Sequence, residues 1–166
     1  MTIGKTIQDA MNDQINKEFF SSYLYLSMAA YFEDKNLMGF AHWMRLQADE
    51  ERNHAMRIYD FVLDRGGKVS LGPVEEPPVK WKSPLEVFEA ARKHEQLVSG
   101  SINALYSQAL NERDYPSQVM LQWFISEQVE EEKTSAAIVE RLRLVGDNAS
   151  GLLILDGQLG QRTGAT

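Results

Sequence analysis

Four long segments with helical periodicity, joined by two short connections and one long connection, limit the folds open to this chain. In each segment apolar residues recur every three to four positions, as on one face of an α-helix. The segments span residues 7–33, 37–64, 84–111 and 117–145. No strand pattern of comparable strength is present in the sequence. The chain is therefore expected to be all-α.

Residues that start and stop helices stand at the limits of these segments. Ser83 offers an N-cap hydroxyl directly before Pro84, which suits the first helical position. The pair 66–67 is Gly-Gly and is expected to end the second helix, because glycine tolerates the left-handed conformation common at helix C-termini. Pro116 is expected to begin the fourth helix, and Gly146 to end it.

The connections between the segments set the topology. Short turns near residues 34–36 and 112–115 make the first pair and the last pair of helices antiparallel. Residues 66–82 form a much longer connection. Fully extended, this connection reaches ~56 Å at about 3.3 Å per residue, whereas a helix of about 28 residues is ~42 Å long. It can therefore run the length of the molecule, which predicts an up-down-down-up four-helix bundle with one long crossover.

The apolar stretch over residues 149–160 is too short to span a membrane and is expected to form a short fifth helix. We prefer the interpretation in which this helix packs against other subunits. A helix that only caps its own bundle is about equally compatible with the sequence. Residues 1–166 are thus predicted to form a single domain, with the bundle over roughly residues 6–146.

Composition and charge exclude several classes of function. The net charge of −7 argues against a nucleic-acid partner, because phosphate contacts need clustered Lys and Arg. The absence of cysteine excludes disulfides, thiolate metal sites and thiol nucleophiles. The first ten residues lack an apolar signal region, and no stretch approaches ~18 uninterrupted apolar residues. No membrane partner is expected. The expected location is cytoplasmic.

Each of the four long segments interrupts an apolar column with a glutamate. Reading in steps of seven, which return to nearly the same helix face, places Glu18, Glu51, Glu95 and Glu131 among mostly apolar neighbours. All four lie near the middle of their segments. Antiparallel helices joined by short turns have their middles at the same level. These carboxylates are therefore expected to converge in one layer inside the bundle.

Such a layer needs positive charge. An unpaired buried carboxylate costs several kcal/mol, and adjacent carboxylates repel each other. No Lys or Arg lies in the columns near this level, so divalent cations are the natural compensation. His54 follows Glu51 at a spacing of three, which lets both side chains reach one ion. Carboxylate oxygens with one imidazole suit Fe(II) or Mn(II), with Zn(II) as a competitor.

Around these residues the sequence resembles the non-haem ferritins of bacteria and archaea over essentially its whole length. The matching stretches cover residues 17–28, 48–56, 93–95 and 121–132. The resemblance implies a dinuclear ferroxidase centre in which Glu18, Glu51 and His54 bind the first iron. Glu51 would bridge to a second iron held by Glu95 and, in many relatives, by the residue at Glu131.

Further residues match family positions near that centre. Gln128 stands where the family uses a glutamine beside the dinuclear site, and Tyr25 matches the tyrosine that contacts it. In prokaryotic relatives a third, weaker iron site is present, and its counterparts here would be Glu50, Glu127, Glu130 and the shared Glu131.

The resemblance also implies a function and an assembly. Iron storage is expected, with oxidation of Fe(II) by O2 or peroxide and an Fe(III) mineral inside a hollow shell of 24 subunits. Haem is not expected, because Arg52 occupies the position at which bacterioferritin-like relatives use a methionine. Gln118 and Leu121 occupy positions that are acidic in the three-fold channels of animal ferritins, so the route of iron into the shell is not implied. The alternative function is a small di-iron or di-manganese oxidase or peroxidase without storage.

Overall fold

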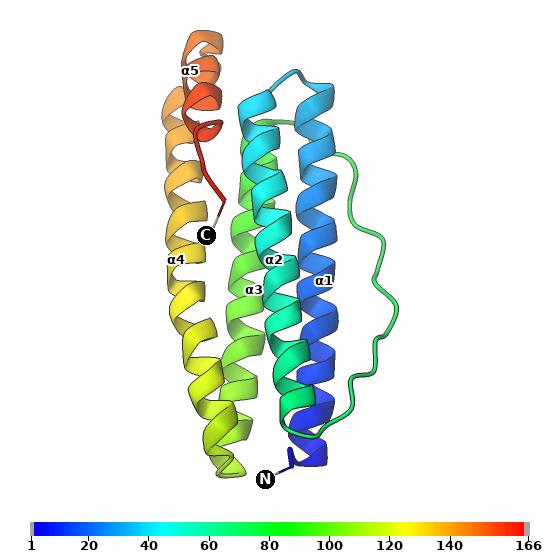
Figure 1. The fold of residues 1–166 in the computed structure, drawn as a ribbon. Coiled ribbons are helices and arrows are strands. Elements are labelled where there is room, and N and C mark those ends of the chain that lie inside the picture. Colours follow the sequence, from blue (N-terminus) through cyan, green and yellow to red (C-terminus); the bar gives the residue numbers. More distant parts are fainter. Residues whose placement is uncertain (1, 165–166) are drawn as a thin grey trace.

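The computed structural model describes residues 2–164, which form an all-α fold (Figure 1). Four long helices lie side by side as a bundle, and a short helix sits at one end of it. The helices are α1 (Lys5–Asp34), α2 (Met38–Asp64), α3 (Pro84–Asn111), α4 (Tyr115–Val145) and α5 (Ala149–Leu159). The predicted five-helix architecture is confirmed, with element boundaries that differ from the predicted ones by at most two residues.

Side-chain caps fix the N-termini of α3 and α4. The Ser83 hydroxyl accepts a hydrogen bond from the backbone N–H of Glu86 at 3.1 Å, as a capping residue should. α4 begins at Tyr115, one residue before the predicted Pro116, because Asp114 is its N-cap. The Asp114 carboxylate accepts from the backbone N–H of Ser117 at 3.2 Å. The capping aspartate, and not the proline alone, sets the start of α4.

A residue with positive φ follows each of the four long helices. Gly66 and Gly146 have φ values of 66° and 53°, which glycine adopts without a Cβ penalty. Both ends were predicted from these glycines. Asn36 and Arg113, in the two short turns, have φ values of 57° and 54°. Asparagine tolerates this region, whereas for arginine it is costly, and the tight α3–α4 turn imposes it.

The crossover between α2 and α3 runs along α1 from one end of the bundle to the other (Figure 1). It therefore makes α2 and α3 parallel, as its length predicted. Three side chains of α1 anchor it by donating hydrogen bonds to its backbone carbonyls. These bonds are Asn12 to Lys68 (3.0 Å), Asn16 to Pro73 (2.8 Å) and Ser27 to Pro78 (2.6 Å).

The core is divided into two apolar clusters by a polar layer. The cluster at the end that carries α5 includes the stacked rings of Phe32 and Phe40, whose centroids lie 4.9 Å apart, and Phe88 beside them. The cluster toward the N-terminus includes Ile58 and Ile102, both fully buried. On every long helix, the predicted glutamate lies between residues of one cluster and residues of the other. The apolar columns thus build the two halves of the core, and the glutamates interrupt it at one level.

Helix α5 caps its own bundle with one face. Leu155 and Leu159 are buried in the cluster below it, and the Asp156 carboxylate accepts a hydrogen bond from the backbone N–H of Phe40 at 2.9 Å. On the opposite face, Leu153 and Ile154 are more than 60% exposed. The capping interpretation therefore holds for one face, and packing of the other face against further subunits stays a prediction.

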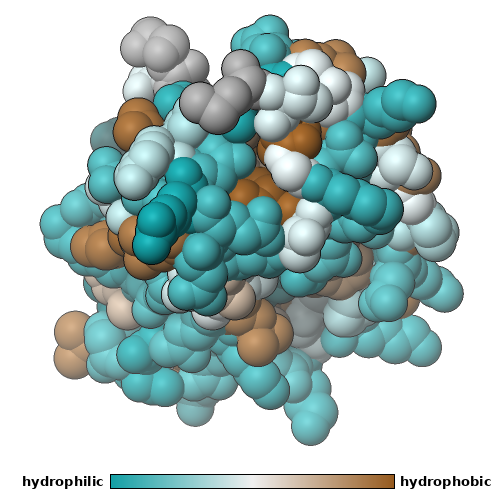
Figure 2. Space-filling model, turned by 90° about the horizontal axis from the view of Figure 1, so that it is seen from below, coloured by the Kyte–Doolittle hydropathy of each residue, from teal (hydrophilic) through white to brown (hydrophobic). Residues whose placement is uncertain are grey.

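The outer surface matches the acidic, hydrophilic composition. Seen from the end opposite α5, the molecule is covered mainly by hydrophilic residues, with hydrophobic ones in separate patches (Figure 2). Among the described residues, every helix falls short of the length and apolar character that a membrane span requires.

Candidate metal centre

The four predicted glutamates lie in one buried layer, each contributed by a different long helix. Glu18, Glu51 and Glu95 are each 1% exposed, and Glu131 is 7% exposed. Their convergence follows from the sequence pattern, because each occupies the inward face at the middle of its helix. The structure thus confirms that acidic side chains from all four helices meet inside an otherwise apolar core.

Glutamine amides hold these carboxylates in place. Gln47, itself fully buried, donates through Nε2 to Glu51 at 2.8 Å and to Glu131 at 2.9 Å. Two further glutamines act in the same way, Gln14 toward Glu18 (2.7 Å) and Gln128 toward Glu95 (3.1 Å). The role of Gln128 was expected, whereas Gln14 and Gln47 were not assigned one. Their only sequence signal is a polar residue in an apolar column.

Tyr25 and an aromatic pair complete the surroundings. The Tyr25 hydroxyl donates a hydrogen bond to Oε1 of Glu95, so Tyr25 contacts the layer as predicted. The His54 imidazole packs edge-on against the rings of Trp123 and Phe124, at centroid distances of 5.4 and 5.8 Å. These contacts restrict the orientation of the imidazole before any ligand binds.

The electrostatics of the layer favour a cation. Burial, strengthened by the charge of Glu51, raises the pKa of Glu18 to about 8. Burial and the charge of Glu95 raise the pKa of Glu131 to about 7. Burial likewise raises the pKa of Glu51 and of Glu95. Positive charge placed here would relieve both the burial cost and the mutual repulsion.

One carboxylate oxygen of the described layer lacks a hydrogen-bond partner. Among the described residues, Oε2 of Glu18 is buried and receives no hydrogen bond. Buried polar atoms in native structures are nearly always satisfied, so an orphaned carboxylate oxygen indicates a missing ligand. Its donor type, a hard anionic oxygen, suits a hard divalent cation such as Fe(II) or Mn(II).

The side chains fall into three groups that can each hold one ion. Within a group, one ligand atom from every residue lies within 4.8 Å of the others. The groups are Glu18–Glu51–His54, Glu51–Glu95–Glu131 and His54–Glu127–Glu131. Glu51 belongs to the first two groups, and its Oε2 lies 3.3 Å from Nδ1 of His54. A carboxylate shared by two groups is placed to bridge two ions.

The residues expected for a third site are only partly brought together. Glu127 joins the third group. The Glu50 carboxylate instead forms an ion pair with Arg162 at 2.6 Å, and that arginine was not foreseen near the layer. Glu130 is exposed and lies 3.5 Å from the ammonium group of Lys133.

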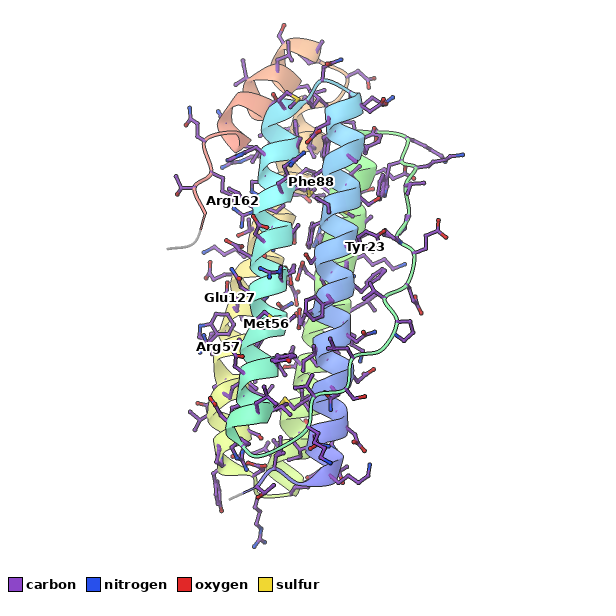
Figure 3. The ribbon with its side chains drawn as sticks, turned by 45° about the vertical axis from the view of Figure 1, so that its right-hand side comes forward. Tyr23, Met56, Arg57, Phe88, Glu127 and Arg162 are labelled. Atoms are coloured by element: carbon purple, nitrogen blue, oxygen red, sulfur yellow. The ribbon has the colours of Figure 1, made fainter. Side chains whose placement is uncertain are left out.

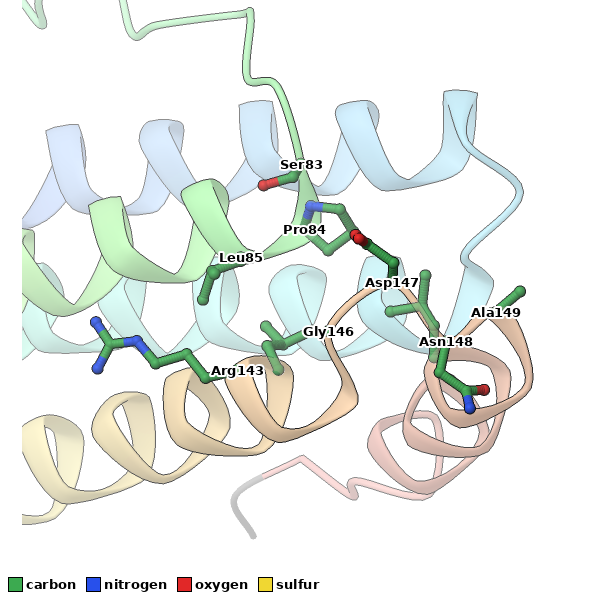
Figure 4. Close-up of a pocket in the computed structure, with 10 residues that line it drawn as sticks. Ser83, Pro84, Leu85, Arg143, Gly146, Asp147, Asn148 and Ala149 are labelled. Carbon is green, nitrogen blue, oxygen red and sulfur yellow. The ribbon is translucent and has the colours of Figure 1, made fainter.

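A small pocket opens beside His54. Its volume is about 260 Å³, and its lining includes Glu50, His54, Trp123 and Glu127. The guanidinium of Arg57 stacks over the Trp123 ring at 4.0 Å, at the rim of this pocket. A larger pocket of about 500 Å³ lies at the end of the bundle between the start of α3 and the α4–α5 turn (Figure 4). Of these two pockets, the smaller one lies at the centre, because His54 and Glu127 of the ligand groups line it.

Comparison with known proteins places this arrangement in a family. The profile of the ferritin-like domain family matches residues 8–145, which contain the whole carboxylate layer. The chain belongs to the ferritin family. Curated relatives of this ferritin include the bacterial non-heme ferritin of Bacteroides fragilis, 44% identical over 96% of this chain and 99% of that protein. The bacterial non-heme ferritin of Escherichia coli is 38% identical over 91% of this chain and 92% of that protein.

Solved structures agree with this ferritin over nearly its whole length. An open-pore ferritin from the archaeon Archaeoglobus fulgidus is 48% identical, with a TM-score of 0.97 over 98% of this chain and all of that one. A closed form of the same archaeal ferritin, engineered by mutagenesis, gives a TM-score of 0.98 at the same identity, over 99% of this chain and all of that one. Membership of the family makes this chain an iron-storage protein.

Proposed function

We propose that this ferritin is a ferroxidase that binds two Fe(II) ions side by side in the carboxylate layer, oxidises them and stores the Fe(III). The first ion would be held by Glu18, Glu51 and His54, and the second by Glu51, Glu95 and Glu131. The observation that carries the proposal is the position of Glu51, which belongs to both ligand groups. A shared carboxylate keeps two ions close enough for both to react with one oxidant.

The ligand chemistry supports iron oxidation. Four carboxylates and one imidazole bind Fe(II), and their negative charge favours the more highly charged Fe(III) product. Each Fe(II) loses one electron. When O2 is the oxidant, the two electrons and two protons convert it to hydrogen peroxide; when peroxide is the oxidant, they convert it to water. The carboxylic protons that the ions displace from the layer are available for this step.

Gln128 and Tyr25 act on the second ion through Glu95. Both donate a hydrogen bond to its carboxylate, Gln128 to Oε2 and Tyr25 to Oε1. The two donors fix the plane of that carboxylate and leave lone pairs for an ion, as outer-shell partners of metal ligands commonly do.

The third ligand group lies on the path by which oxidised iron would leave the centre. It shares His54 and Glu131 with the two ion sites and extends through Glu127 to the small pocket. We propose that Fe(III) leaves the layer past Glu127. Glu50, on the wall of the same pocket, and Glu130, on the surface of α4, belong to this proposed path as weaker ligands.

The store itself requires an assembled container, and we propose the 24-subunit shell that ferritins form. The exposed leucine and isoleucine of α5 support further subunit contacts. The Archaeoglobus ferritin is an open-pore ferritin, and site-directed mutagenesis gives it a closed form. Particle mass and iron content of protein purified from iron-fed cells test this part. A small particle that turns over without accumulating iron would favour the alternative di-iron or di-manganese enzyme.

The ferroxidase step is tested by Glu51→Ala and His54→Ala, with Glu140→Ala as the matched control. Glu140 is an exposed glutamate of α4 that pairs with Arg143, outside the layer. Stopped-flow absorbance of Fe(III) formation is expected to slow by roughly 10- to 100-fold or more in the first two variants, because ligands are lost. The control should oxidise iron at the wild-type rate. Rapid oxidation in both ligand variants would overturn the proposal.

A further inference from the structure

The segment that follows α5 brings a cation to the edge of the metal centre. Arg162 lies against α2, where its Nη2 contacts the Glu50 carboxylate at 2.6 Å and its Nη1 donates to Oε1 of Gln47 at 2.9 Å. Its guanidinium also stacks over the Trp43 ring at 4.4 Å. The Arg162 and Glu50 side chains are 20% and 19% exposed, so this pair is largely shielded from water.

Arg162 reaches the ligands themselves through Gln47. A glutamine amide has one accepting end and one donating end. Arg162 takes the accepting oxygen, and the donating nitrogen bonds to Glu51 and Glu131. The arginine thereby fixes which end of the amide faces the carboxylates that would hold the ions.

Arg162 and an incoming metal ion would compete for the Glu50 carboxylate. Glu50 lines the small pocket together with His54 and Glu127, and Figure 3 shows Arg162 and Glu127 along the same edge of the bundle beside α2. A carboxylate that is paired with a guanidinium has fewer lone pairs free to bind a metal ion. The positive charge of the arginine also repels a divalent cation in the same pocket.

We propose that Arg162 is a positioning residue of the metal centre, and that it holds Glu50 until a divalent ion entering the small pocket displaces it and releases the C-terminal segment. This inference rests on the proposed function, because it assigns a regulator to the same site. Metal binding at Glu50 and docking of the segment then oppose each other. Each weakens the other by the same factor, as linkage requires.

The segment is built so that it can leave without unfolding the bundle. Leu155 and Leu159 anchor α5, and they precede the docked arginine in the chain. Among the described residues beyond α5, the polar contacts with α2 are all made by Arg162. Its side chain bonds to Trp43, Gln47 and Glu50, and its carbonyl oxygen lies 2.8 Å from the His42 ring nitrogen. Release would break a few polar contacts and leave the apolar anchor in place.

The experiment combines zinc titration with hydrogen exchange on the assembled protein. Zn²⁺ serves as a redox-inert probe, its binding isotherm is measured by calorimetry, and exchange of the backbone amides of residues 160–164 is followed by mass spectrometry. The variants are Arg162→Gln, Arg162→Lys and Glu50→Gln. Arg143→Gln is the control, since Arg143 pairs with two glutamates elsewhere on the surface.

In the wild type, saturating zinc is expected to speed amide exchange in residues 160–164 by about 5- to 20-fold. Arg162→Gln should tighten the weakest class of zinc sites by the same factor and make exchange fast with or without zinc. Arg162→Lys keeps the charge but loses the planar guanidinium group, so it should retain part of the zinc response. Glu50→Gln should abolish that response, and the Arg143 control should behave as wild type.

Two results would overturn the inference while leaving the proposed function intact. One is zinc binding at the dinuclear centre with no change in exchange of residues 160–164. The other is an Arg162→Gln isotherm that superimposes on the wild-type curve, which would give the arginine a purely structural role. Absence of any zinc binding to the wild type would instead overturn the proposed function and this inference together.

Discussion

The metal-free protein is expected to lose stability as the pH rises from about 5 to about 7.5, and Glu18→Gln should reduce that loss. The pKa of Glu18 is raised from its ordinary value of 4.5 to about 8. Between these values the folded chain keeps the proton that the unfolded chain has released. The stabilising contribution of this proton is therefore complete below pH 4.5 and is lost as the pH approaches 8.

The magnitude follows from the linkage relation. One group that binds a proton only in the folded state lowers the free energy of unfolding by about 1.4 kcal/mol per pH unit. For a chain of this size, 1 kcal/mol corresponds to about 2–4 °C in Tm, so Glu18 accounts for about 3–6 °C per pH unit. The variant keeps the oxygen that accepts from Gln14 and removes the titration. Its Tm should therefore fall with pH less steeply than that of the wild type, by this amount.

The assay is calorimetric melting of chelator-treated protein between pH 5 and pH 7.5. Glu140→Gln, at an exposed position, is the control and should follow the wild-type slope. Zinc should reverse the trend, because metal binding requires deprotonated ligands and so strengthens with pH. Parallel curves for the wild type and Glu18→Gln would refute the reasoning, because they would show that Glu18 holds no extra proton in the folded state.

Three further predictions address the centre, the bundle and α5. Zinc binding at pH 6 should release at least one proton per chain, measured by calorimetry in two buffers of different ionisation enthalpy; zero release would contradict the raised pKa values. Asp114→Ala removes the α4 cap and the carboxylate that Arg65 contacts through two hydrogen bonds, so stability should fall by about 3 kcal/mol. An unchanged Tm would contradict this. Gly39→Ala would place a Cβ 1.7 Å from the Asp156 carbonyl oxygen and should loosen α5, seen as faster amide exchange there, whereas Gly100→Ala meets open space and should not.

The sequence predicted the bundle and the layer well because both follow from regular spacing. Apolar residues at helical intervals specify four long helices, and glutamates on the inward face of each specify a common level. The long crossover was predictable from its reach alone. The three polar side chains of α1 that anchor it were not predicted, because half-buried asparagine and serine carry no spacing signal of their own.

The sequence did not predict the roles of residues whose contacts depend on how distant parts of the chain pack together. Gln14 and Gln47 are polar residues in apolar columns, but only the structure shows which carboxylates they contact. Arg162 lies more than one hundred residues from Glu50 in sequence, and it reaches that side chain only because α5 turns the chain back onto α2. The sequence signal for the start of α4 was Pro116, and the capping role of Asp114 is seen only in its contact with the Ser117 N–H.

Anomalous diffraction from crystals soaked anaerobically with Fe(II) tests the metal centre most directly. We expect two strong iron peaks per chain, one among Glu18, Glu51 and His54 and the other among Glu51, Glu95 and Glu131, with the Glu51 carboxylate between them. Iron bound only to exposed acids, with the buried layer free of anomalous density, would contradict the account.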